Sequence, residues 1–145
     1  MRDTYVCAFY HFAWATKRRE PLIAPEWEHL LYAHLSAHCV EMGVKVYAVN
    51  GMPDHMHLVC TVPPSLAVSN VLHDLKGRSA YFINHSDDER ALYWQRGFGM
   101  HTFARNELDS IVAYVQNQKQ RHQTQKLWDS LENFEKTNAL GNSNR

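Results

Sequence analysis

The fold is decided by a hairpin pattern in residues 44–62, which read VKVYAVNGMPDHMHLVCTV. Two apolar runs, 44–49 and 55–62, have the composition of strands. Between them, Asn50-Gly51 favours positive φ angles, and Pro53 cannot donate a hydrogen bond to a strand ladder. The pattern therefore predicts two antiparallel strands joined by a turn at residues 50–54.

The segments on either side complete the order of elements. Residues 5–15 (YVCAFYHFAWA) are rich in aromatic residues and predict a strand, and apolar spacing predicts a helix from about Pro25 to a stop at Gly43. After the hairpin, a second helix carries an apolar stripe from Val68 to Ile83, and residues 98–103 predict a fourth strand. Asn106 favours the cap of a third helix, which is expected to end near His122.

This order, β-α-β-β-α-β followed by α, predicts an α+β fold. The first six elements match the ferredoxin-like plan, an antiparallel sheet with two helices on one face. The third helix is additional and must lie elsewhere. We expect one domain over residues 1–123 and an amphipathic helix with a flexible tail over residues 124–145. The apolar stripe of that last helix is Leu127, Leu131 and Phe134, and residues 141–145 are expected to be disordered.

Composition excludes several classes of protein. Fifteen Lys and Arg balance fifteen Asp and Glu, so nucleic acid would have to bind through local patches. No apolar run approaches the roughly 20 residues that span a bilayer, and the first residues do not resemble a signal peptide. No nucleotide-binding glycine motif and no C-x-x-C pair occurs. Cys7, Cys39 and Cys60 are expected to be reduced core residues of a cytoplasmic protein.

The chain has ten histidines, and His55 and His57 form the most informative pair. Side chains two apart on a strand share one face, so two imidazoles can converge on a cation. The alternative is two polar residues on a half-exposed strand. His11 is ambiguous, because a neighbouring strand could bring it close to the pair. The other histidines are expected to pack locally or lie at the surface: His29, His34, His38, His73, His85, His101 and His122.

The predicted third helix carries a tyrosine beside its apolar stripe. Tyr114 lies at the flank of that stripe, in a polar row with Ser110, Gln118 and Arg121. It is either an edge tyrosine or a nucleophile. Tyrosine has a pKa near 10 and needs help from a cation to attack at pH 7. A divalent ion held by two imidazoles and the Gln118 amide could polarise a scissile phosphate, so the combination favours a phosphodiester nickase.

Five segments resemble one known family, the single-tyrosine HUH-endonuclease transposases of the smallest bacterial insertion sequences. This IS200-like family includes relatives associated with repetitive extragenic palindromes. The segments are YHFAWATKRREPL (10–22), GMPDHMHLV (51–59), LKGRSAYFIN (75–84), WQRGFG (94–99) and YVQNQKQRH (114–122). The most diagnostic feature is His55-Met56-His57, and the second is Tyr114 with Gln118 four residues later.

The resemblance implies an RRM-like HUH transposase domain that acts on single-stranded DNA with hairpins and uses Mg²⁺ or Mn²⁺. We expect neither a nucleotide cofactor nor a membrane partner. His55 and His57 would be metal ligands with Gln118 as the third. Tyr114 would form a 5′-phosphotyrosine and release a 3′-OH. The family also implies a homodimer in which the tyrosine helix of one subunit can complete the site of the other.

Contact with DNA is supported by local basic clusters, since phosphate attraction needs only such patches. The clusters are Lys17, Arg18 and Arg19; Lys76 and Arg78; and Lys119 and Arg121. Tyr10, Phe12 and Trp14 could stack on bases, although aromatic residues on a central strand are more often core.

Two other functions stay open at this point. One is a non-catalytic module that binds hairpin DNA or RNA, which would not need all four of His55, His57, Tyr114 and Gln118. The other is a metal-dependent hydrolase that uses the histidine pair and water, for which Tyr114→Phe would stay active.

Overall fold

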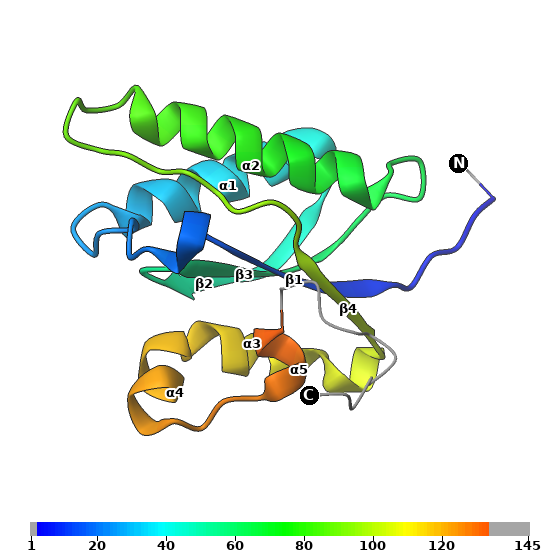
Figure 1. Ribbon diagram of the computed structural model, residues 1–145. Coiled ribbons are helices and arrows are strands. Elements are labelled where there is room, and N and C mark those ends of the chain that lie inside the picture. The colour runs from blue at the N-terminus through cyan, green and yellow to red at the C-terminus, as the bar shows by residue number, and fades with distance from the viewer. Residues whose placement is uncertain (1–2, 134–145) are drawn as a thin grey trace, which may run out of the picture.

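The computed structural model describes residues 3–133 as an antiparallel sheet with helices on both faces (Figure 1). The strands lie in the order β2-β3-β1-β4. Their bounds are β1 Phe9–Ala15, β2 Lys45–Met52, β3 His55–Thr61 and β4 Gly99–Phe103. The predicted α+β class and element order are confirmed. The first strand begins at Phe9 rather than residue 5, because its pairing with β4 begins there, opposite Phe103.

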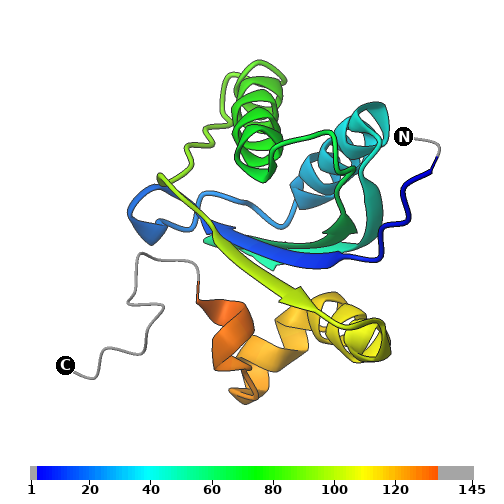
Figure 2. The same ribbon diagram turned by 90° about the vertical axis from the view of Figure 1, so that its right-hand side faces the viewer.

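One face of the sheet is covered by α1 Glu28–Met42 and α2 Val68–Asn84, which lie side by side above it (Figure 2). Phe12 and Trp14 of β1 point into this layer and are fully buried, so they are core residues and not base-stacking surfaces. Gly43 ends α1 as predicted, with a φ of 77°. The helix begins later than predicted, at Glu28, because residues 25–27 form a turn that precedes it.

The other face carries three short helices, α3 Leu108–Gln116, α4 Gln118–Thr124 and α5 Asp129–Glu132 (Figure 2). The predicted position away from α1 and α2 is confirmed. One continuous helix to His122 is wrong, because the backbone leaves helical geometry at Asn117, whose side chain donates to the Ala113 carbonyl. Asn106 is not a cap either, since it lies inside a short 3₁₀ turn, Arg105–Glu107.

The β2–β3 hairpin fixes the position of the tyrosine helix. Met52 pairs with His55, so only Pro53 and Asp54 form the turn, which is tighter than predicted. A Cβ at Gly51 would lie 2.3 Å from the His55 carbonyl oxygen, which explains the glycine. The amide of Asn50 donates to the carbonyls of Val115 and Gln116, at 3.0 and 3.1 Å. The end of α3 is thereby held over the strand that precedes His55.

Further sequence expectations have mixed outcomes. Cys39 and Cys60 are buried as predicted, but Cys7 is exposed because it precedes the first strand. Leu131 of the last predicted stripe is buried against the sheet, whereas Phe134 and residues 141–145 lie outside the described residues. No helix within residues 3–133 is long and apolar enough to cross a membrane.

Candidate metal and tyrosine site

His55 and His57 lie on the sheet face that α3–α5 cover. Both side chains are almost completely buried, with exposures of 1% and 0%, so they are not on a half-exposed strand. Their ring centroids are 5.0 Å apart. The alternation of β3 produces this placement, because Met56 and Leu58 point the other way into the core beneath α1 and α2.

Two residues that the sequence analysis did not assign to the site complete the cluster. Glu132 of α5 places its carboxylate 3.3, 3.4 and 3.3 Å from the Nε2 atoms of His55, His57 and His122. One ligand atom from each of these four residues lies within 4.8 Å of every other. His122 is therefore a site residue and not the surface or locally structural residue that we expected.

Tyr114 meets this cluster from α3. Its side chain is fully buried, and its hydroxyl donates to Glu132 and accepts from the Trp128 backbone N–H. Its ring lies 6.3 Å from the His57 ring and stacks on Trp128. Burial and the carboxylate of Glu132 raise the pKa of Tyr114 to about 12. Because Tyr114 is fully buried, it is not a tyrosine at the edge of a packed face. Its hydroxyl needs a nearby cation before it can ionise near neutral pH.

Gln118 opens α4 directly beyond the Asn117 break and is also fully buried. Its Nε2 lies 3.4 Å from Glu132 and its Oε1 lies 3.0 Å from Nε2 of His122. The structure therefore brings together His55, His57, Tyr114 and Gln118, all four residues predicted for the catalytic centre.

Burial and hydrogen bonds act in opposite directions on the pKa values of the carboxyl groups in and beside the cluster. Burial alone would raise the pKa of Glu132, but contacts with His55 and His57 outweigh it and hold the carboxyl ionised. Nδ1 of His55 lies 2.7 Å from Asp54, which also pairs with Arg19 at 3.2 Å. The hydrogen bond with His55 is the main reason that the pKa of Asp54 falls to about 2. A cluster of three imidazoles and one carboxylate suits a divalent metal ion.

The family model described as transposase IS200-like matches residues 4–118. The chain belongs to this family. The match covers the sheet, α1–α3 and Gln118, and it ends before His122 and Glu132.

Two curated relatives of this IS200-like transposase illustrate the distance within the family. The ISDra2 transposase TnpA of Deinococcus radiodurans is 27% identical over 115 residues, which cover 75% of this chain and 82% of that protein. The transposase for insertion sequence element IS200 of Salmonella typhimurium is 24% identical, with 75% of each chain covered.

Two solved structures share the fold. A putative transposase from Deinococcus radiodurans superposes with a TM-score of 0.60 at 26% identity, covering 79% of this chain and 93% of that one. A REP-associated tyrosine transposase bound to a REP hairpin gives a TM-score of 0.59 at 17% identity, covering 79% and 67%. The second likeness concerns the fold alone.

His122 and Glu132, the two site residues that the sequence analysis missed, differ in whether a sequence pattern points to them. His122 follows Gln118 by four residues, so it continues the row of Tyr114 and Gln118 and could have been found. Glu132 lies on a four-residue helix behind a loop, where no periodic pattern points to it.

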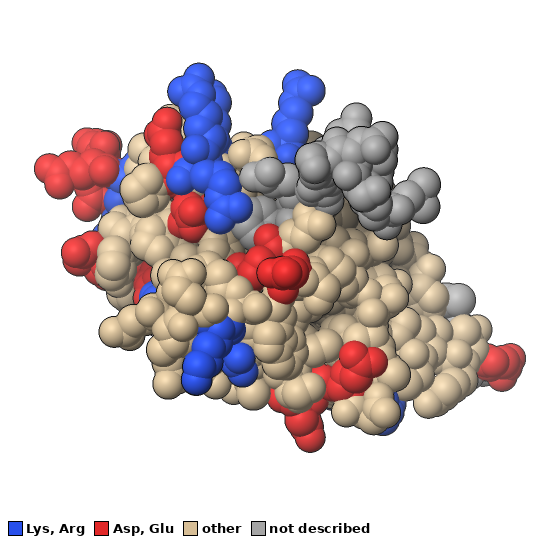
Figure 3. Space-filling view, turned by 60° about the horizontal axis from the view of Figure 1, so that its bottom comes forward, with Lys and Arg blue, Asp and Glu red and all other residues tan. Residues whose placement is uncertain are grey.

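The basic residues of the transposase do not form one surface. Figure 3, which views the α3–α5 side, shows basic side chains in separate groups with acidic ones between them. Arg19 and Lys119 pair with Asp54 and Glu28, and Arg78 lies 3.5 Å from Glu41. Arg121 lies over the rings of Tyr114 and Trp128, at 5.1 and 5.3 Å.

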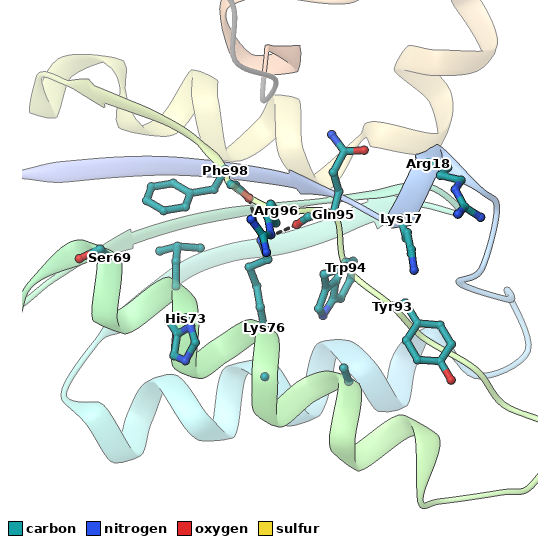
Figure 4. Close-up of a pocket in the computed structure, with 14 residues that line it drawn as sticks. Lys17, Arg18, Ser69, His73, Lys76, Tyr93, Trp94, Gln95, Arg96 and Phe98 are labelled. Carbon is teal, nitrogen blue, oxygen red and sulfur yellow. Dashed lines mark hydrogen bonds between the residues drawn. The ribbon is translucent and has the colours of Figure 1, made fainter.

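The remaining three predicted DNA-binding residues, Lys17, Arg18 and Lys76, line one pocket of about 920 Å³ (Figure 4). Arg96, which the sequence analysis did not single out, lines it too. The ammonium group of Lys76 donates to the carbonyls of Gln95 and Gly97, both at 2.7 Å, and so holds the wall opposite α2. Gly77 of α2 also lines this pocket, and a Cβ added there would meet open space.

Proposed function

We propose that this transposase nicks and rejoins single-stranded DNA at hairpin-forming element ends, through a 5′-phosphotyrosine at Tyr114 and with a divalent metal ion. The observation that carries the proposal is the hydroxyl of Tyr114, which lies in the same buried cluster as His55 and His57. A module that only binds DNA has no use for a tyrosine hydroxyl placed at a set of metal-ligand atoms.

In the proposed reaction, the Tyr114 oxygen loses its proton and bonds to the scissile phosphorus. The bond from phosphorus to the 3′ oxygen breaks, and that oxygen takes up one proton and leaves as a 3′-OH, so the protons balance. Glu132 accepts the hydrogen bond of the tyrosine hydroxyl and so aims it. Rejoining reverses these steps with a 3′-OH as nucleophile. No ATP is required, because the phosphotyrosine keeps the energy of the broken bond. Since Trp128 covers the Tyr114 ring, the phosphate can enter only after Trp128 moves.

The donor set fits a metal ion. Two atoms that ligate one ion at about 2.1–2.4 Å each can lie up to roughly 4.2–4.8 Å apart. The observed spacings are 3.3–3.4 Å from Glu132 to each imidazole and at most 4.8 Å overall. His55, His57, His122 and Glu132 would hold the ion, with Gln118 beside them. When bound, it would stabilise negative charge on the phosphate and the tyrosine oxygen. Three imidazoles suit a transition-metal ion better than Mg²⁺, which prefers oxygen ligands.

The pocket between α2 and residues 93–98 is the proposed site for the DNA backbone next to the cleavage point. Lys17, Arg18 and Arg96 supply positive charge at its rim, and Tyr93 offers an aromatic ring that is 55% exposed. Gln95 of the pocket wall donates its backbone N–H to Ala15, and Ala15 pairs with His55. One strand of DNA could therefore reach from the pocket to the metal cluster around the edge of the sheet. The related structure that is bound to a REP hairpin supports a hairpin as the partner.

Trapping the covalent adduct tests the proposal. A labelled single-stranded oligonucleotide with Mn²⁺ should give a protein–DNA adduct that survives a denaturing gel, and EDTA should prevent it. Tyr114→Phe should abolish the adduct, whereas Tyr93→Phe, at an exposed tyrosine, should retain it. Nicking by Tyr114→Phe would favour the hydrolase alternative, in which water attacks, and an adduct in that variant would place the nucleophile elsewhere.

We also propose a homodimer, because excision needs cleavage at two ends and each chain offers one candidate tyrosine. Tyr114 lies at the histidines of its own chain in the structure. A heterodimer of His57→Ala and Tyr114→Phe chains should therefore stay inactive, since neither chain keeps a complete site. Recovered nicking in verified heterodimers would instead mean that α3 is exchanged between subunits.

A further inference from the structure

His11 is a fully buried histidine in the middle of the sheet whose role the proposed reaction does not explain. It lies on β1, opposite Val59 of β3 on one side and His101 of β4 on the other. Its Nε2 is 2.8 Å from Nδ1 of His57, and its Nδ1 is 3.4 Å from Nδ1 of His101. The two nitrogens of His11 therefore face two other imidazoles.

We infer that His11 is a positioning residue that fixes the ring orientation and the tautomer of His57. The inference rests on the proposed role of His57 as a metal ligand. To ligate through Nε2, the neutral ring of His57 must carry its proton on Nδ1. The atom next to that proton is Nε2 of His11, which must then be the hydrogen-bond acceptor.

The same reasoning assigns the rest of the chain of imidazoles. If Nε2 of His11 accepts, its proton is on Nδ1 and points towards Nδ1 of His101. His101 then accepts on Nδ1 and carries its own proton on Nε2, at the partly exposed end of the chain. The ligand role of His57 thus allows only one direction for these hydrogen bonds.

The partner of His57 differs in kind from the partner of His55. His55 donates through Nδ1 to the carboxylate of Asp54, which is the common arrangement for a metal-binding histidine. The acceptor for His57 is the uncharged ring of His11, which is fully buried. A carboxylate at this buried position would carry a charge away from solvent, which costs free energy. Orientation by partners of this kind contributes 10- to 100-fold to metal affinity in other proteins.

Two amide variants separate positioning from simple packing. His11→Gln places an amide near the Nε2 position of the imidazole and can still accept from His57, whereas His11→Asn places it near Nδ1 and cannot. Both variants remove the ring and keep the side chain polar. Binding of Mn²⁺ is measured by loss of the electron paramagnetic resonance signal of the free ion. We expect His11→Asn to weaken binding about 10- to 100-fold and His11→Gln to stay within about threefold of the unchanged protein.

The outcomes distinguish this inference from the proposed function. If the unchanged protein binds no Mn²⁺, or His57→Ala binds it equally well, the proposed metal site fails and the inference falls with it. If the unchanged protein binds through His57 and the two His11 variants bind alike, the proposed function stands and the positioning role is overturned. Thermal unfolding without metal should show similar stability for both variants.

A spectroscopic measurement on the unchanged protein decides the matter even if neither variant folds. With Zn²⁺ as a diamagnetic probe, long-range ¹H–¹⁵N spectra of labelled histidines report which ring nitrogen carries each proton. Protons on Nδ1 of both His57 and His11 would support the inference. A proton on Nε2 of His11 would overturn it.

Discussion

The two faces of the sheet bury different kinds of side chain: mostly apolar ones on one face and a polar cluster on the other. Under α1 and α2 most of the buried side chains are apolar, among them Trp14, Leu35 and Leu75, and the buried polar residues of these helices are His38 and Ser79. Under α3–α5 an apolar rim that includes Val59, Val115 and Leu131 surrounds the buried polar groups of the metal and tyrosine cluster. One strand serves both faces, since alternate residues of β3 point into each.

This difference separates stability from activity within one small domain. Burial of apolar surface contributes about 25 cal/mol per Å² to folding, whereas burial of imidazole and carboxylate groups costs free energy unless each is paired. Burial on the α1–α2 face therefore supplies most of the free energy of folding. Part of that free energy offsets the cost of the desolvated polar groups on the α3–α5 face. Substitutions on the two faces should have opposite profiles.

The largest effect should come from His57→Ala on the polar face. Loss of this imidazole removes a proposed ligand, so we expect nicking to fall by about 10³-fold or more. The loss of unfolding free energy should be smaller than the roughly 4 kcal/mol that a 10³-fold loss of rate represents, because burial of an imidazole itself costs free energy. A single-turnover nicking assay and thermal unfolding of the same preparation check both parts. If the loss of unfolding free energy were as large as the loss of activation free energy for nicking, the proposed contrast between the two faces would be wrong.

The reverse profile should come from Leu75→Ala on the apolar face. Leu75 is fully buried beneath α2, so truncation should cost about 2–5 kcal/mol of unfolding free energy. Nicking per folded molecule should change little at a temperature where the variant is still folded. Urea titration measures the first quantity. A large loss of activity in the folded variant would show that the two faces are coupled.

Asp54→Asn sharpens the comparison at the partly exposed carboxylate that holds the buried His55 ring. The pKa of Asp54 is about 2 in the folded protein, below its unfolded value of 3.8, so ionised Asp54 stabilises the fold above about pH 5. That stabilisation is lost as the pH falls through 2. We expect a difference of about 1 kcal/mol at pH 7, reduced by solvent screening at this partly exposed side chain.

The melting temperatures of the unchanged protein and Asp54→Asn, compared between pH 5 and pH 2, test this expectation. The difference between the two should shrink towards the acid end. A constant difference would mean that the charge of Asp54 is not what stabilises the hairpin turn.

The smallest effect should come from Arg96→Ala at the rim of the pocket. Removal of one phosphate contact should weaken single-stranded DNA binding by about threefold and lower the salt dependence by about one unit of slope. Arg78→Ala is a matched control, because Arg78 is exposed beside Glu41 and does not line this pocket. Equal losses in both variants would favour a diffuse basic surface over a defined pocket.

Local patterns in the sequence predicted the sheet and four of the six residues of the candidate site. Strict alternation in residues 55–62 separates His55 and His57 from Met56 and Leu58 without any knowledge of the fold. Helical spacing likewise aligns Tyr114 with Gln118. Glu132 could not be predicted, because its place in the cluster depends on how the loop after Gln125 turns back under the sheet. The role of His11 depends on strand register, which no local pattern determines.

The position of Glu132 near the end of the described chain gives the site a second, mechanical meaning. An ion bound by His55, His57, His122 and Glu132 would be a cross-link from the β2–β3 hairpin to α5, closing a long loop of the chain. Mass action would then stabilise the whole α3–α5 layer in proportion to the logarithm of free metal concentration. Without the ion, α5 has only Leu131 as a buried apolar anchor, so its amide hydrogens should be among the first to exchange.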